Sequence, residues 1–364
     1  MKFTIIKSKF LEGLKNVQNI VGAKGSLPIL QNVLIEAKGK ELILTTTDLD
    51  ISIRCQLECE IQEEGSSTLP VKFLFAAMTK ADEGKVEVRI DSNDKGVVIS
   101  GKSRLTLNGM KAEDFPKLNS DEESLEYKLP RSIFYEMLKK THYAASQDDT
   151  RRTLKGVLMS FKSNNLTMVA TDGRRLAMIN QEIEFPAESD KDITLPAKTV
   201  QELLRSINGE GDVRLVVQKS KICFELENLK IYSKLIDDVY PNYNQVIPKN
   251  NETKISVDRL LLINALERAN VMSIDESHSA KLIFSENNLT VTTVANNIGD
   301  FHDEVAIKYN GSPLEIVFNP DYVMDPLKAI DDDEIIFNLN SGSTPAIITC
   351  SIPFLYVIMP LRVN

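Results

Sequence analysis

The sequence predicts an α+β protein built from one structural module of about 120 residues that is written three times. Three observations predict this. A short run with alternating apolar residues opens each copy, an amphipathic helical stretch follows it, and further strands come after in the same order. The openings, at Met1, Glu126 and Lys254, lie 125 and 128 residues apart. We therefore expect three domains, at residues 1–124, 125–250 and 251–364.

Each copy is itself a doublet of strand–helix–strands units. The helices of the first halves are expected at Ser8–Val21, Arg131–Ala144 and Asp258–Val271. Those of the second halves are expected at Val71–Lys80, Ala197–Ile207 and about Asp321–Ile330. Pairs of strands should follow the first-half helices at Asn32–Glu36, Glu41–Thr47, Gly156–Lys162, Leu166–Thr171, Lys281–Ser285 and Leu289–Ala295.

The apolar periodicity places the helices on the sheets. The stretch from Val86 to Ile90 alternates apolar and charged residues, so one face of its sheet is buried and the other is wet. Phe10, Leu14 and Val17 recur at helical spacing and form a stripe that must rest on a sheet. The outer faces of all six helices then occupy equivalent places.

Pro326 interrupts this regularity in the middle of the sixth helix. Proline removes a backbone donor and clashes with the preceding turn, at a cost of about 3 kcal/mol. We expect a kink or an early end there.

The composition is that of an ordinary globular protein, with 42% apolar and 26% charged residues. No apolar run approaches the ~20 residues that span a membrane, and the first residues do not form a signal peptide. The four cysteines resemble reduced cytosolic thiols, so a cytoplasmic location is expected. Cys55 and Cys59 could share one strand face, but no second pair lies at zinc spacing. No metal or cofactor is therefore expected.

The charge is unevenly distributed. A net charge of −9 by itself argues against a nucleic-acid partner. Five of the six expected helices are nevertheless neutral or basic, while acidic residues concentrate in connections such as Glu63–Glu64 and Asp331–Glu334. If the helices share one surface, that surface is basic. The charges taken alone fit ordinary solvated helix faces better than a basic binding surface.

Motifs of catalysis are missing. There is no phosphate-binding Walker loop, no zinc-protease His pair and no nucleophile elbow. Gly209-Glu210-Gly211 fits a turn better than a nucleotide loop, and the three histidines fall in different copies or halves. Asp48 with Asp50, and Asp148 with Asp149, fit turns better than a magnesium site. We expect no enzyme; the alternatives are an enzyme acting on nucleic acid and a scaffold that binds only proteins.

One stretch, Ala170-Thr171-Asp172-Gly173-Arg174-Arg175-Leu176-Ala177, resembles the signature of the bacterial replicative sliding clamps, the beta subunits of DNA polymerase III. Further matches run along essentially the whole chain: Met1-Lys2-Phe3-Thr4, Leu27-Pro28-Ile29-Leu30, Asp114-Phe115-Pro116, Tyr240-Pro241 and Tyr356-Val357-Ile358-Met359-Pro360-Leu361-Arg362.

The resemblance implies a non-catalytic processivity factor with domains of DNA-clamp fold. Its chains would form a head-to-tail homodimer closed into a ring, with helices inside and sheets outside. Basic helix faces would then meet double-stranded DNA without reading its bases. The implied partners are the replicative polymerase subunit, a clamp-loader ATPase and other proteins that carry clamp-binding peptides; no membrane is implied.

The resemblance also implies three sets of site residues. DNA contacts are expected at Lys24, Lys72, Arg151, Arg152 and Lys198. A peptide-binding cleft is expected at Leu154, Thr171, Gly173, Arg174, Arg175, Leu176, Pro241, Val246, Asn319, Tyr322, Met324, Val357, Met359, Pro360 and Leu361. The dimer interface is expected where Leu105 and Leu107 meet Val271 and Met272 of the other subunit. Leu154, Leu176 and Val246 also fit a purely structural place in the core.

The sequence departs from the family pattern in places. Lys24 stands where relatives often have arginine, which keeps the cation. Some relatives have aromatic residues near Arg152 and Thr153, so a stacking role does not carry over. The tail Arg362-Val363-Asn364 extends slightly beyond one common ending.

Overall fold

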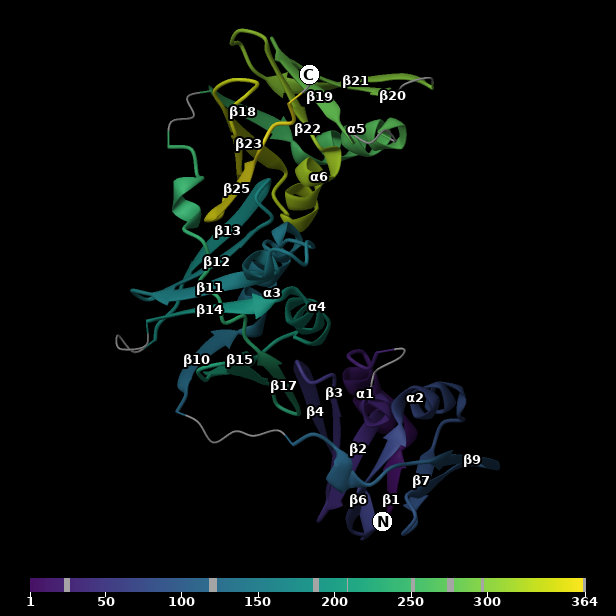
Figure 1. Cartoon of the computed structure of the whole chain (residues 1–364). Coiled ribbons are helices and arrows are strands. Elements are labelled where there is room, and N and C mark those ends of the chain that lie inside the picture. The colour runs from purple at the N-terminus through teal and green to yellow at the C-terminus, as the bar shows by residue number, and fades with distance from the viewer. Residues whose placement is uncertain are drawn as a thin grey trace. The chain divides into compact units, whose positions relative to one another are not determined.

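The computed structural model describes residues 1–22, 27–117, 123–185, 190–207, 209–249, 253–273, 278–295 and 298–362. The chain forms two compact units (Figure 1). One contains Met1–Ser132 and Gln201–Leu235, and the other contains Ile133–Val200 and Ile236–Asn364. The division runs through the second copy of the repeat, and the expected domain limits stay a prediction.

The three copies carry their elements in the same order, except that the first has one additional strand, β5. The first contains β1 (Lys2–Ile6), α1 (Lys7–Gln18), β2 (Asn32–Lys38), β3 (Glu41–Thr47), β4 (Ile51–Glu58), β5 (Glu60–Glu63), β6 (Gly65–Pro70), α2 (Val71–Lys80), β7 (Lys85–Ile90), β8 (Lys95–Ser100) and β9 (Ser103–Asn108). The second contains β10 (Leu125–Pro130), α3 (Arg131–Lys139), β11 (Gly156–Lys162), β12 (Asn165–Thr171), β13 (Arg175–Glu182), β14 (Lys191–Pro196), α4 (Ala197–Ser206), β15 (Asp212–Val217), β16 (Lys221–Glu225) and β17 (Leu229–Lys234). The third contains β18 (Thr253–Asp258), α5 (Arg259–Met272), β19 (Ala280–Ser285), β20 (Asn288–Ala295), β21 (Gly299–Lys308), β22 (Leu314–Phe318), α6 (Pro320–Ala329), β23 (Glu334–Leu339), β24 (Ala346–Thr349) and β25 (Phe354–Ile358). Short 3₁₀ turns lie at Pro28–Gln31, Ala112–Asp114, His142–Ala144, Arg152–Leu154 and Tyr243–Gln245.

The third helix is shorter than its periodicity predicts, because it ends at Lys139 instead of Ala144. Thr141 has left the helical conformation, with φ −123° and ψ −38°. Its hydroxyl donates to the carbonyl oxygen of Met137 at 2.8 Å, a side-chain bond that competes with the helix backbone. A 3₁₀ turn at His142–Ala144 replaces the last helical turn.

The strands of the described residues form three sheets. The first unit holds a five-stranded sheet, β5-β1-β7-β8-β9, and an eight-stranded sheet, β10-β15-β16-β17-β4-β3-β2-β6. The second unit holds a twelve-stranded sheet, β14-β11-β12-β13-β25-β24-β23-β18-β21-β20-β19-β22. Consecutive copies are joined in the same way, because the last strand of one copy pairs with the fourth strand of the copy before it. Strand β17 pairs with β4, and β25 pairs with β13.

The helices cover one face of the sheets, as the apolar stripes predict. Phe10, Leu14 and Val17 of α1 are fully buried. The rings of Phe3 and Phe10 meet edge to face with centroids 6.0 Å apart. In the first unit α1 packs beside α2, and in the second α5 packs beside α6 (Figure 1). The other faces of the helices are left for charged residues.

Helix α6 continues through Pro326 to Ala329, so no early end occurs. Proline has no N–H to donate to the carbonyl of Tyr322, four residues earlier. The hydroxyl of Tyr356 on β25 donates to that oxygen at 2.7 Å in its place. Tyr356 is completely buried and Tyr322 is partly buried, so the donor side of this bond lies in the core. A side chain from another element therefore repairs the helix at its proline.

Tyr356→Phe should lower the free energy of unfolding by about 1–3 kcal/mol, because it leaves the Tyr322 carbonyl without a donor. In a Pro326→Ala background the helix regains its own donor, and the cost of Tyr356→Phe should fall by about 1 kcal/mol or more. Urea unfolding of the four proteins in this double-mutant cycle measures both values. An equal cost in the two backgrounds would contradict the repair.

Candidate functional site

The signature stretch folds into a tight turn between β12 and β13. The Asp172 carboxylate accepts backbone N–H bonds from Arg174 at 2.8 Å and from Arg175 at 3.0 Å. The Thr171 hydroxyl donates to the Arg175 carbonyl at 2.6 Å and accepts from the Gly173 N–H at 3.1 Å. Gly173 has φ +86°, in the left-handed region that favours glycine. The turn delivers two arginines to the start of β13.

Arg175 is the centre of a buried polar cluster, and its side chain is only 10% exposed. Its Nε donates to Asp172 at 3.1 Å, its Nη2 donates to the Tyr143 carbonyl at 2.6 Å, and its Nη1 pairs with Asp325 of α6. The guanidinium also lies 4.1 Å from the centre of the Tyr322 ring. This one side chain joins the second copy of the repeat to the third.

The surroundings of Arg175 keep its guanidinium positively charged. Burial by itself would lower the pKa of Arg175, but Tyr356, Asp325 and Asp172 raise it above its usual value. The guanidinium therefore stays protonated, and its fork of donors fixes Tyr322 and Asp325 relative to the turn.

The C-terminal strand lies directly beside the turn. Leu176 pairs with Val357 in the ladder between β13 and β25. Past the end of β25, the Met359 N–H donates to the Arg174 carbonyl at 2.9 Å, and the Leu361 N–H donates to the Val317 carbonyl at 2.8 Å. The structure thus brings the predicted residues from the turn and from the chain end together in one unit.

The predicted cleft residues differ in exposure, which separates those in the core from those at the surface. Leu176 is 1% exposed and Val357 is 3% exposed, and both belong to a buried cluster with Leu158, Val169 and Ile347. The alternative that the residue has a purely structural place in the core therefore fits Leu176. Val246, at 55%, and Met359, at 44%, are open to solvent and do not fit it.

The predicted cleft residues at the start of α6 and within it have structural contacts in the helix itself. The Asn319 side chain caps it, accepting from the N–H groups of Asp321 at 2.9 Å and Tyr322 at 3.3 Å. Met324 is 4% exposed. Met324 is therefore inside the unit, whereas Met359 and Val246 expose apolar atoms to solvent.

Two of the predicted DNA contacts come together. Arg152 and Lys198 line one recess of about 550 Å³ together with Lys155, and Asp237 and Asp238 line the same recess. Arg151 lies instead on the signature turn, where its Nη1 donates to the Asp172 carbonyl at 3.1 Å. Lys72 is exposed on α2, in the other unit. Lys24 lies outside the described residues.

The basic helix residues fall into two groups that counting charges could not distinguish. In the third copy, Arg268 bonds to Asp303 at 2.8 Å and Lys328 pairs with Glu267 at 2.8 Å. Lys9, Lys15 and Lys72 of the first copy are exposed and make no ion pair with any described residue. Helices α1 and α2 therefore expose lysines without an acidic partner among the described residues, whereas these basic residues of α5 and α6 are already paired.

The predicted interface residues lie at two open places. Leu105 and Leu107 are partly exposed on β9, the last strand of its sheet. Val271, at the end of α5, is 70% exposed. Two further apolar residues beside the β20–β21 connection, Val294 at 69% and Ile298 at 62%, are also exposed and escaped the sequence analysis. The sequence could have indicated them, because both are branched apolar residues that lie next to a turn.

The thiols and carboxylates singled out in the sequence have structural surroundings. Burial raises the pKa of both Cys55 and Cys59 to about 11, so both remain protonated thiols at neutral pH. Asp148 caps a turn by accepting from the N–H and hydroxyl of Thr150. Across the described ranges, no three His, Cys, Asp or Glu side chains form a group that could hold a metal ion. No helix in those ranges has the length and apolar character to cross a membrane.

Comparison with known proteins gives one consistent result. Family models for the N-terminal, central and C-terminal domains of the DNA polymerase III beta subunit match residues 1–119, 128–242 and 244–362. The beta sliding clamp of Chlamydia muridarum is 33% identical over 364 residues, and that of Haemophilus influenzae is 30% identical over 371; each alignment covers 100% of both chains. The crystal structure of the DNA polymerase III subunit beta from Pseudomonas aeruginosa superposes with a TM-score of 0.94 at 30% identity, covering 100% of both chains.

Proposed function

Because the chain belongs to the family of DNA polymerase III beta subunits, the beta sliding clamps, we propose that it is a DNA sliding clamp and not an enzyme. Two chains would close head to tail into a ring around duplex DNA in the cytoplasm, with helices inside and sheets outside. The ring would tether the replicative polymerase and other DNA-processing proteins. The repeated strand junction carries this proposal, because it leaves two complementary strand edges open.

Among the described residues the junction occurs twice, between the first and second copies and between the second and third. Strand β4 accepts β17, and β13 accepts β25. The equivalent strand of the third copy is β21, whose corresponding edge pairs only through Lys308 and Ile307 with β18. The equivalent of β17 and β25 in the first copy is β9, which lies at the end of its sheet. A partner's β9 on β21 would complete the series, and a head-to-tail pair satisfies both edges at once.

The side chains at these edges support the same junction. Leu105 and Leu107 of β9 pair with the buried Val98 and Gly96. In the same way, Tyr356 and Ile358 of β25 pair with the buried Ile348 and Ala346. Tyr356 and Ile358 are fully buried against the helices at their junction. Leu105 and Leu107 would be buried likewise, against Val271 and its neighbours on α5 of the partner. Apolar residues that are open in one chain then become the core of the interface.

The DNA contacts we propose are Lys24, Lys72, Arg151, Arg152 and Lys198. We add Lys9 and Lys15 because both are exposed on α1. Lysine and arginine bind phosphates without reading bases, and such binding is weak, with Kd of about 10⁻⁴ to 10⁻⁶ M. Retention on DNA would therefore come from closure of the ring. A partner held on the ring works at high effective concentration along the DNA.

Partner peptides would dock beside the signature turn. We propose the fifteen predicted residues as this site, with Met359 and Val246 as apolar contacts and Arg174 at the polar edge. The polymerase subunit, the clamp loader and other partners would compete for it. The loader ATPase would supply the energy of ring opening, since no nucleotide-binding motif occurs in the sequence.

Linearising the DNA tests encirclement. The protein, loaded on a nicked circular plasmid and freed of excess by gel filtration, should remain bound while the circle is intact. Cutting the plasmid once should release it, because a ring slides off free ends. A parallel sample with both ends blocked by a bound protein should keep it. Retention on the unblocked linear DNA would contradict topological tethering.

A further inference from the structure

The turn that positions the peptide site has a counterpart in the first copy, between β3 and β4. The Asp48 carboxylate accepts backbone N–H bonds from Asp50 at 2.9 Å and Ile51 at 2.7 Å. The Thr47 hydroxyl donates to the Ile51 carbonyl at 3.1 Å and accepts from the Leu49 N–H at 3.1 Å. Each of these four hydrogen bonds has an equivalent, with the same kind of donor and acceptor, in the turn at residues 171–175.

The neighbouring strand is also in the same register at both places. Ser52 pairs with Tyr232 as Leu176 pairs with Val357. The Lys234 N–H donates to the Asp50 carbonyl at 2.9 Å, in the place of the bond from Met359 to Arg174. Pro116, in the closing segment of the first copy, corresponds to Pro241 in the second. The first unit therefore contains a structural counterpart of the peptide site, with different side chains.

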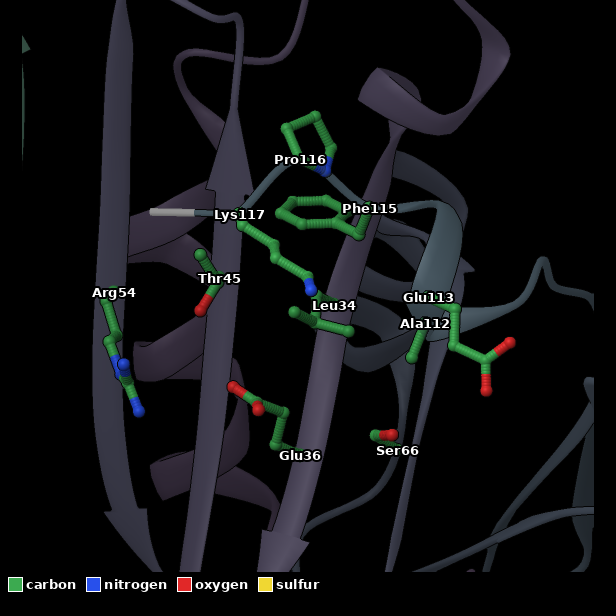
Figure 2. Close-up of a pocket in the computed structure, with 10 residues that line it drawn as sticks. All are labelled: Leu34, Glu36, Thr45, Arg54, Ser66, Ala112, Glu113, Phe115, Pro116 and Lys117. Atoms are coloured by element: carbon green, nitrogen blue, oxygen red, sulfur yellow. The ribbon is translucent and has the colours of Figure 1, made fainter. Parts of the chain in front are cut away.

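This counterpart is hollow. A cavity of about 150 Å³ is lined by Leu49, Ser52, Pro116, Lys117, Lys221 and Tyr232, among others. A second cavity of about 420 Å³ adjoins it and shares Pro116 and Lys117 (Figure 2). Figure 2 shows Phe115, Pro116 and Lys117 lying across the strands that carry Leu34, Thr45 and Arg54. We call the two cavities together the first-copy groove.

The smaller cavity is positively charged. Lys117, Lys221 and Lys234 line it, with Asp50 as its acidic residue. Asp50 is already paired with Lys234 at 3.0 Å. Lys117 and Lys221 make no ion pair with any residue in the described ranges. The cavity is therefore complementary to a ligand that carries negative charge.

Leu49 gives the groove an apolar contact at a conformational cost. Its φ is +79°, close to that of Gly173 at the matching place, although leucine disfavours this region. Its side chain is 46% exposed, so burial does not explain the residue. Strained residues of this kind concentrate at binding sites. The exposed leucine stands next to the lysines.

We propose that the first-copy groove is a second peptide-binding site, which takes a short extended segment combining acidic and aliphatic side chains. The lysines would bind the carboxylates, and Leu49 with Pro116 would contact the aliphatic groups. The larger cavity contributes Glu36 and Glu113 besides Arg54. Those carboxylates repel a continuous phosphate backbone, which favours a peptide of mixed character over a nucleic acid.

A defined probe tests the proposal on the full chain. The probe is a fluorescent, five-residue, end-blocked peptide of alternating glutamate and leucine, measured by polarisation with the Met359→Ala variant to weaken the other site. Lys221→Glu should lower its affinity at least tenfold. The same drop should follow when glutamine replaces glutamate in the probe. Lys40→Glu, at an exposed lysine between β2 and β3, should change little.

A second variant separates binding from folding. Leu49→Gly removes the apolar contact and relieves the positive φ, so probe affinity should fall severalfold while the thermal midpoint does not fall. The proposal is overturned if the probe does not bind, if Lys221→Glu and Lys40→Glu behave alike, or if a five-nucleotide oligothymidylate displaces the probe from this groove at lower concentration than the unlabelled peptide.

Discussion

Arg175→Ala should lower the free energy of unfolding of the second unit by about 3 kcal/mol, because it leaves both Asp172 and Asp325 without the cation that they share. It also removes the donor to the Tyr143 carbonyl and the cation over the Tyr322 ring. The turn and α6 would then lose their common tie. Affinity for a peptide from the replicative polymerase should fall about tenfold as a result, which corresponds to about 1.4 kcal/mol.

Urea unfolding followed by near-ultraviolet tyrosine signals measures the stability, and isothermal titration measures the peptide. Arg174→Ala is the matched control, since this neighbouring arginine is exposed and its turn bond comes from its backbone N–H. It should change stability by less than about 0.5 kcal/mol. Arg175→Lys keeps the charge without the fork of donors and should lie between the two. Equal stability of the Arg174 and Arg175 variants would show that the cluster does not hold the site.

The sequence predicts the local elements well where one periodicity dominates. Helix α2 spans Val71–Lys80 and strand β11 spans Gly156–Lys162, both as their apolar patterns indicate. The fourth strand of each copy was not assigned from the sequence, although β13 begins inside the signature. Its partner β25 comes more than 170 residues later, as the pair Leu176–Val357 illustrates. A pairing between such distant segments leaves no periodic trace in either.

The site shows the same limit at the level of single side chains. The resemblance places Arg175 in the expected cleft, but the sequence alone does not show that its guanidinium pairs with Asp325, 150 residues further along the chain. Counting the charges of each helix likewise does not show that Arg268 of α5 pairs with Asp303 on β21. Residue type and helix face are local properties and can be read from the sequence. The partner of a charge depends on the fold.

Val271→Glu combined with Met272→Glu should convert the proposed dimer to monomers, raising the dimer Kd at least a thousandfold, or about 4 kcal/mol. Val271 is 70% exposed in the single chain, so a charge there should leave the fold intact. In the proposed interface the two carboxylates would face Leu105 and Leu107 of the partner, away from water and without cations. Burial of unpaired charge is costly enough to prevent association. Sedimentation velocity over a range of concentrations measures the change.

The matched control is Val239→Glu, at a valine that is 91% exposed and lies outside the proposed interface. It should sediment like the unsubstituted protein, and a persistent dimer in the double variant would rule out this interface. A further readout separates loss of the ring from general damage. All fifteen residues proposed for the peptide site lie within the second unit, so the monomeric double variant should still bind a polymerase peptide with unchanged affinity. It should fail to remain on nicked circular DNA, because one chain offers the open edges of β9 and β21 but no partner strand for either.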